Sequence, residues 1–246
     1  MNLIEFIKNN QNYLEDLITR STYHSNAIEG NTLTYAETYA VIYNDNSFIV
    51  KKQPREIYEA INHKEALEYL LNNMLDSKEN NDLSISDIIN LNKIINQNIN
   101  ETNGFRKVQV YIRGSEHIPP EAKNVPNLMY YYIYNYKNSM DDLFTKIAKY
   151  HIEFERIHPF EDGNGRTGRL LINYELIKNN FPPAIITKED RVKYYEFLKN
   201  DDIEGFAKFL EETVNKEKER LEKFGYTFEE ENAEDKNIKN NNNSER

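Results

Sequence analysis

Apolar residues recur every three or four positions along most of the chain, which is the period of an amphipathic α-helix. Near the N-terminus the first such face consists of Leu3, Ile4, Ile7, Leu14 and Ile18. The same spacing predicts further helices over residues 54–75, 84–99, 125–136, 141–157, 168–180, 190–200 and 202–224. The sequence lacks the self-similarity, at a period of about 20 to 50 residues, that marks a solenoid. We therefore predict one all-α domain over residues 1–226, built as a helical bundle.

One segment breaks the helical period. In residues 107–120, apolar Val108, Val110 and Ile112 alternate with other residues, and a turn signal follows at Gly114. This alternation predicts a small β-hairpin with one apolar face. Two interpretations stay open: a connector on the helical core, or an exposed flap that pairs with an extended segment of a partner. In the second, the docking residues are Val110, Ile112, Arg113 and Gly114.

The composition excludes several kinds of site. The chain has 246 residues, no cysteine and a net charge of −10. Without cysteine there is no disulfide, thiol nucleophile or cysteine zinc site, which suits a reducing cytoplasm. The negative charge argues against nonspecific nucleic-acid binding. We see no signal peptide and no apolar run approaching ~20 residues, so we expect a cytoplasmic protein without a membrane span. Residues 227–246 are acidic and Asn-rich, and we predict that they are disordered.

Candidate functional residues are most concentrated in "HPFEDGNGRTGR", residues 158–169, between two predicted helices. Pro159 disfavours helix at the residue before it, so the first helix should end at His158. A helix C-terminus raises the pKa of an imidazole, and His158 should accept a proton near neutral pH. Gly163 and Gly165 remove side chains from the start of the second helix. The free N–H groups of that first turn, together with the helix dipole, make an anion site.

Charged side chains surround this anion site. Arg166 and Arg169 lie three residues apart on one helical face, and arginine forks suit the oxygens of a polyphosphate. Asp162 is placed to hold Mg²⁺ against phosphate oxygens, because magnesium favours a carboxylate combined with phosphates. The pattern as a whole is typical of phosphoryl-type transfer, which depends on positioning and on charge stabilisation.

Other known motifs fit residues 158–169 less well. The G-x-G-x-x-G spacing from Gly163, with Glu189 some twenty residues later, resembles a dinucleotide fingerprint, but a helix precedes it and no βαβ units follow. An EF-hand loop starting at Asp162 would need an oxygen ligand and a glycine where Arg166 and Thr167 stand. The sequence contains no P-loop. A salt-bridged glycine turn alone would not explain so many converging polar residues.

Residues 158–169 resemble the Fic family signature H-P-F-x-[D/E]-G-N-G-R-x-x-R, with every position filled. The hairpin segment and "VPNLM" after it also look like the flap of that family and its flanking helix. The similarity spans residues 1 to 224. It implies an all-α core and transfer of AMP from ATP to a protein hydroxyl, with Mg²⁺. Relatives that transfer other groups tend to deviate from the full signature, which favours adenylylation here.

The resemblance also implies a role for each residue. His158 would deprotonate a Ser, Thr or Tyr hydroxyl of the target, and Asp162 would bind the metal. Tyr194 and Tyr195 look like the tyrosines of the adenine pocket, although core positions on a helix explain them nearly as well. Asp202 stands where relatives often have an asparagine. The expected nucleotide-binding residues are Asp162, Gly163, Asn164, Gly165, Arg166, Thr167, Gly168, Arg169, Tyr194 and Tyr195.

A second stretch, "STYHSNAIEGNTLT", carries a candidate restraint over residues 21–31. We expect Ser25 to cap a short helical turn that Gly30 closes. Glu29 then lies at a helix C-terminus, where an acid is disfavoured unless a cation pairs with it. The stretch resembles the inhibitory motif [S/T]-x-x-x-E-[G/N] of Fic proteins, in the class with an N-terminal inhibitory helix. That resemblance implies a pair between Glu29 and Arg169.

Three functions stay open at this point. The first is a self-restrained protein adenylyltransferase that also modifies itself. The second is an ATP-binding interaction module with little transferase activity, and the third is an enzyme that removes AMP with the help of Glu29. The identity of the target protein cannot be inferred from the sequence, and a homodimer remains an option.

Overall fold

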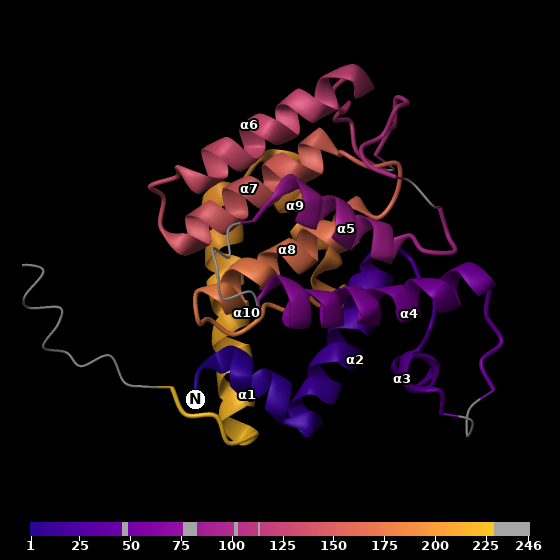
Figure 1. Cartoon of the computed structure of the whole chain (residues 1–246), viewed down its shortest axis with the longest axis vertical. Coiled ribbons are helices and arrows are strands. Elements are labelled where there is room, and N and C mark those ends of the chain that lie inside the picture. Colours follow the sequence, from indigo (N-terminus) through magenta and orange to yellow (C-terminus); the bar gives the residue numbers. More distant parts are fainter. Residues whose placement is uncertain (46–48, 76–82, 101–102, 113, 229–246) are drawn as a thin grey trace, which may run out of the picture.

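The computed structural model describes residues 1–45, 49–75, 83–100, 103–112 and 114–228 (Figure 1). Its α-helices are α1 (Leu3–Asn9), α2 (Gln11–Ile28), α3 (Tyr35–Tyr43), α4 (Pro54–Tyr69), α5 (Ile85–Ile95), α6 (Val125–Lys137), α7 (Leu143–Ile157), α8 (Asn164–Lys178), α9 (Arg191–Asn200) and α10 (Ile203–Lys223). A π-helical turn η1 (Leu70–Met74) follows α4, and the 3-10 turns η2 (Ala122–Asn124) and η3 (Lys188–Asp190) precede α6 and α9. The prediction of a helical fold is confirmed.

Helix α8 lies in the middle of the bundle, in contact with α7, α5, α2 and α1 (Figure 1). Nearly all of its residues are buried. Leu170, Leu171 and Tyr174 belong to one hydrophobic core, whereas Ile172 and Leu176 belong to a second core on the other side. Since each fully buried leucine or isoleucine contributes about 1.5–3 kcal/mol, these two cores hold the start of α8 in a fixed position.

The N-terminal segment differs from the prediction, because the single expected helix is two helices. They meet at Asn10, whose side chain accepts a hydrogen bond from the Tyr13 amide at 3.1 Å and donates one to the Phe224 carbonyl, also at 3.1 Å. Asn10 thus ends α1 and caps α2. Helix α3 was not predicted. Its signal is a capping box in which Thr34 and Glu37 each accept a hydrogen bond from the backbone of the other.

The predicted β-hairpin is not confirmed. The described residues of segment 105–121 contain no strand, and side chains rather than a backbone ladder join the two arms. Arg106 donates to the carbonyls of Val108 and Pro120, and Gln109 donates to the Pro119 carbonyl at 2.9 Å. Alternation alone cannot specify backbone pairing, because two isolated strands are barely stable in water. The proposed docking residues Val110 and Ile112 are half-buried and Gly114 is exposed, while Arg113 lies outside the described residues.

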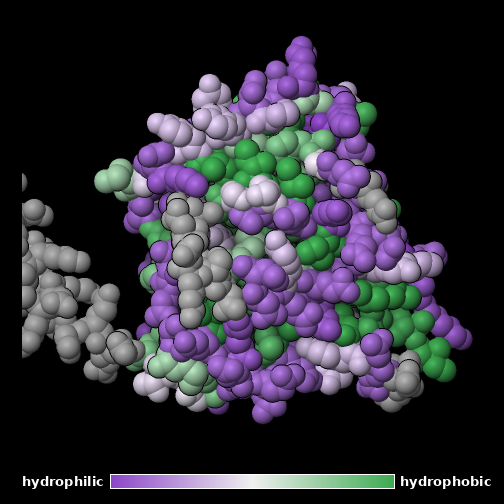
Figure 2. Space-filling model, viewed as in Figure 1, coloured by the Kyte–Doolittle hydropathy of each residue, from purple (hydrophilic) through white to green (hydrophobic). Residues whose placement is uncertain are grey.

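The surface agrees with the charged composition. Figure 2 shows hydrophilic side chains over most of the face seen in Figure 1, with apolar patches between them. Across the described ranges, no helix is long and apolar enough to cross a membrane. Tyr226 is buried against Phe6 at 4.9 Å between ring centroids, so the packed part of the chain continues to the predicted domain end. Residues 229–246 of the predicted tail lie outside the described residues.

Candidate active site

The turn between α7 and α8 is held by its own side chains. His158 ends α7 in the left-handed region, with φ 49°, and the ring of Phe160 is buried in the core. The buried Asn164 side chain accepts a hydrogen bond from the Phe160 amide and donates one to the Phe160 carbonyl, both at 2.9 Å. Asn164 therefore shapes the turn with its side chain and offers only its backbone to a ligand.

Helix α5 holds the other side of this turn. Asn92 and Asn96 both donate to the Asp162 carbonyl, at 2.9 and 3.0 Å, and Asn92 also donates to the buried Thr167 hydroxyl. Gly163 has φ 76°, and a β-carbon there would lie 2.8 Å from a methyl carbon of Ile95. Only glycine combines this conformation with so close an approach to α5.

The imidazole of His158 has a defined tautomer. Its Nδ1 lies 3.2 Å from the carbonyl oxygen of Glu155, which can only accept, so Nδ1 carries the proton and Nε2 has the free lone pair. Arg106 donates to the carbonyl of His158 at 2.8 Å and fixes its backbone. Burial lowers the pKa of His158, more than the Glu155 carbonyl and Glu29 raise it, which corrects the expectation of a raised pKa at the helix end. The neutral, proton-accepting form therefore predominates at neutral pH.

Asp162 lies at the mouth of α8 between two arginines. One oxygen, Oδ1, accepts from the Gly163 amide at 2.6 Å and from Arg166 at 3.0 Å, while Oδ2 accepts from Arg55. Burial alone would raise the pKa of Asp162, but the charges of Arg166 and Arg55 lower it, so this carboxyl is ionised at neutral pH. Among the described residues no group of three or more His, Asp or Glu side chains could hold a metal ion. A single ionised carboxylate beside a phosphate site still fits Mg²⁺, which usually takes one or two carboxylates and completes its shell with phosphate oxygens and water.

Arg169 binds the end of α2. It donates to the Ser25 hydroxyl at 3.0 Å, to the Ser25 carbonyl at 2.9 Å and to Glu29 at 2.8 Å. Ser25 lies inside α2 rather than capping a short turn, so its expected capping role is wrong. Gly30 follows with φ 98°, which agrees with the expected turn. A β-carbon at Gly165 would lie 2.3 Å from a Glu29 oxygen, so the Glu29 carboxylate lies directly on the first turn of α8.

The two arginines of the motif have different partners but share one property. Arg166 and Arg169 are both buried, yet Nε and Nη1 of Arg166 and Nη1 of Arg169 have no hydrogen-bond acceptor within the described part of the chain. Buried charged donors are normally paired, because an unpaired one costs several kcal/mol. Three such nitrogens beside the start of α8, of which Nη1 of Arg166 has the Glu59 carboxylate at 3.5 Å, indicate a site for an anion with several oxygens.

The remaining predicted nucleotide residues have different environments. Tyr194 is fully buried, with its hydroxyl 2.8 Å from Nε2 of His151, so it occupies a core position beneath Arg169. Tyr195 is half-buried and donates to the Ile28 carbonyl at 3.3 Å. Gly168 faces α7, where a β-carbon would lie 2.9 Å from both Glu155 and His151. Of these three residues, Tyr195 is the least buried.

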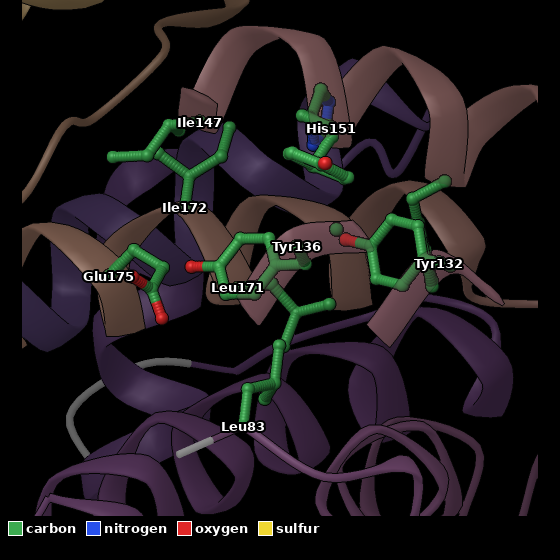
Figure 3. Close-up of a pocket in the computed structure, with 11 residues that line it drawn as sticks. Leu83, Tyr132, Tyr136, Ile147, His151, Leu171, Ile172 and Glu175 are labelled. Atoms are coloured by element: carbon green, nitrogen blue, oxygen red, sulfur yellow. The ribbon is translucent and has the colours of Figure 1, made fainter. Parts of the chain in front are cut away.

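A cavity behind the motif, between α6, α7 and α8, is not the nucleotide site (Figure 3). It is lined by Leu83, Tyr132, Tyr136, Ile147, Tyr150, His151, Phe154, Gly168, Leu171, Ile172 and Glu175. In Figure 3 the Tyr136 hydroxyl points toward Glu175. Its volume of about 20 Å³ is sufficient for one water molecule but not for a nucleotide.

Several residues of the site carry no signal in the sequence. Arg55 and Glu59 of α4 contact Asp162 and Arg166, and Glu155 lies beneath Gly168 with a pKa that burial and the charge of Glu29 raise to about 8. They come from helices with ordinary amphipathic spacing. Their proximity to the motif is a consequence of helix packing alone.

This chain is similar to known proteins in sequence and in fold. Residues 82–176 match the Fic/DOC family. "Protein adenylyltransferase Fic" of Nematostella vectensis is 34% identical over 204 residues, covering 76% of this chain and 45% of the relative. The protein of the same name from Drosophila virilis is also 34% identical, over 79% of this chain and 40% of its own length. The chain thus spans less than half the length of these curated relatives.

Solved structures show the same fold. Fic-1 from C. elegans superposes with a TM-score of 0.74 at 29% identity, covering 85% of this chain and 63% of that one. A Fic-domain-containing signaling protein from Bacteroides thetaiotaomicron superposes with a TM-score of 0.77 at 24% identity, covering 89% of this chain and 92% of that one. With the complete signature at residues 158–169, on the loop after α7 and the first turns of α8, and with relatives of this kind, the chain belongs to the Fic/DOC family.

Proposed function

We propose that this chain is a nucleotidyltransferase of the Fic type, which transfers AMP from ATP to a hydroxyl of a protein. One observation carries the proposal: three buried guanidinium nitrogens of Arg166 and Arg169 have no hydrogen-bond acceptor at the start of α8, and the same motif holds His158 with a free Nε2. The curated relatives are named as protein adenylyltransferases, which supports the same activity.

The proposed reaction is an in-line displacement at the α-phosphorus of ATP. The backbone amides of Gly163, Asn164 and Gly165 and the side chains of Arg166 and Arg169 hold the phosphates. The hydroxyl oxygen of the target attacks the α-phosphorus, its proton passes to Nε2 of His158, and the bond to the departing pyrophosphate breaks. Mg²⁺ held by Asp162 would neutralise phosphate charge. Before the transfer, the carbonyl of Glu155 holds the ring proton on Nδ1 and so leaves Nε2 free to accept.

We further propose that Glu29 restrains this activity. Its carboxylate pairs with Arg169 and lies on Gly165, so it takes up both a guanidinium and the space that an outer phosphate would need. ATP would then bind in a pose unsuited to transfer, as long as the pair persists.

Segment 107–120 is the proposed docking site for the target protein. Val108 and Tyr111 of this segment are exposed, and Arg106 joins the segment to the motif by donating to the carbonyls of Val108 and His158. An extended peptide that docks along the segment would present its hydroxyl to the imidazole. Self-modification would use the same geometry with a hydroxyl of a second copy.

The test is mass spectrometry after incubation with Mg-ATP and a lysate. The wild-type chain and Glu29→Gly should give an AMP adduct on protein hydroxyls, more strongly in the variant, and His158→Ala should give none while still binding ATP. Transfer that survives in His158→Ala would show that His158 is not the base. ATP binding without any adduct in either of the first two proteins would favour a nucleotide-responsive interaction module instead.

A further inference from the structure

Arg55 makes an unexpected contact with the site. It lies in the first turn of α4, far from the motif in sequence, and its guanidinium donates to Oδ2 of Asp162. The other oxygen, Oδ1, is already bound by the Gly163 amide and by Arg166. Oδ2 is therefore the oxygen of Asp162 at which a metal would bind, and Arg55 covers it.

The two arginines on Asp162 differ in their freedom to move. The Arg166 side chain is 3% exposed and buried within α8, whereas the Arg55 side chain is 56% exposed. A second carboxylate, Glu59, lies 3.1 Å from Nε of Arg55 and 3.5 Å from Nη1 of Arg166. Arg55 can therefore leave Asp162 and keep its hydrogen bond to Glu59, whereas the buried Arg166 would lose its hydrogen bond to Asp162 and keep only the more distant Glu59.

Glu59 is itself held in place. Its Oε2 accepts a hydrogen bond at 2.9 Å from Asn31, two residues after Glu29, and its side chain is 10% exposed. Because this fixed carboxylate already accepts a hydrogen bond from Nε of Arg55, the guanidinium keeps a charged partner when it releases Asp162.

We propose that Arg55 is a positioning residue that occupies the metal-binding oxygen of Asp162 until Mg²⁺ arrives with the nucleotide, and then releases Asp162 while it keeps its hydrogen bond to Glu59. The inference rests on the proposed nucleotide site and specifies how that site admits its metal. In the free protein Arg55 thereby neutralises charge on Asp162. A metal that binds Asp162 must first break this half-exposed ion pair, and the free energy of the pair is subtracted from the free energy of metal binding.

The test compares the affinity for AMPPNP, an ATP analogue with a non-cleavable outer linkage, in EDTA and in Mg²⁺ by calorimetry. The dissociation constant in EDTA divided by the dissociation constant in Mg²⁺ is called the magnesium gain. In Arg55→Gln, which keeps most of the side-chain stem, the gain should be about fivefold larger than in the wild type, the size expected for a half-exposed ion pair. Arg55→Lys keeps the charge and should stay near the wild-type gain. Arg220→Gln removes a similar half-exposed arginine from Asp16 and should leave the gain unchanged.

Asp162→Asn separates this inference from the nucleotide site itself. It should abolish the gain, and adding Arg55→Gln should then have no effect. A gain in Arg55→Gln equal to or below that of the wild type, while Asp162→Asn still abolishes it, overturns the role of Arg55 and leaves the proposed function standing. An increase that persists without Asp162 overturns it as well. If no variant binds AMPPNP, both proposals fail together.

Discussion

The contact between Glu29 and Arg169 can be tested by Glu29→Gly. The substitution removes a charge-assisted hydrogen bond of 2.8 Å and clears the space above Gly165. Such bonds contribute about 1.5–3 kcal/mol, and the Glu29 side chain is 32% exposed, so solvent screening favours the lower half of that range. Since 1.4 kcal/mol corresponds to a factor of ten, freeing Arg169 should raise the rate of AMP transfer by about 10- to 40-fold.

The assay is incorporation of radiolabelled AMP from ATP, at saturating ATP so that binding and rate are separated. Glu15→Gln is the matched control, because Glu15 also lies on α2 but bonds Tyr39, away from α8, and it should leave the rate unchanged. Ser25→Ala removes another contact of Arg169 and should raise the rate less than Glu29→Gly does. A rate in Glu29→Gly that equals or falls below the wild-type rate would refute the restraint.

Two further predictions concern stability. Gly163→Ala forces a side chain to φ 76° and into α5, and should lower the free energy of unfolding by about 1–3 kcal/mol in urea titrations; an unchanged midpoint would mean that the turn adapts freely. Burial lowers the pKa of both His63 and His151 to about 3, so the unfolded chain binds more protons below pH 6.5 and stability falls with acidification. At pH 5, each of these histidines should lower the free energy of unfolding by about 2 kcal/mol. Urea titrations at pH 7 and pH 5 measure this loss, and the free energy of unfolding should fall less between the two pH values in His63→Gln and in His151→Gln than in the wild type.

The sequence predicted elements well wherever one helical face is apolar. The expected helices near 125–136, 141–157 and 202–224 are close to α6, α7 and α10, because burial of one face is a local property of the pattern. The break at Asn10 was missed, since a capping asparagine at that position depends on a carbonyl of Phe224 at the other end of the chain. The hairpin was predicted from alternation, but pairing of two strands requires contacts that alternation does not encode.

The site was predictable in part for a similar reason. The motif brings His158, Asp162 and both arginines together within twelve residues, so their proximity follows from the chain itself. The pair between Glu29 and Arg169 was expected from a resemblance, and the structure brings the two side chains together. The direction of the His158 pKa was wrong, because burial outweighs the effect of the helix end and burial cannot be judged from local sequence.

The sequence by itself determined a helical chain and one loop with the residues for phosphate chemistry, since periodicity and a contiguous motif are local properties. The tertiary structure alone decided which groups surround that loop: the carboxylate of Glu29 on Gly165, Arg55 on Asp162 and the asparagines of α5 beneath the turn. These contacts join residues about 65 to 140 positions apart, and they form because two hydrophobic cores fix the helices around α8. The distances and exposures of those partners are the quantities on which the proposed restraint by Glu29 and the proposed role of Arg55 depend.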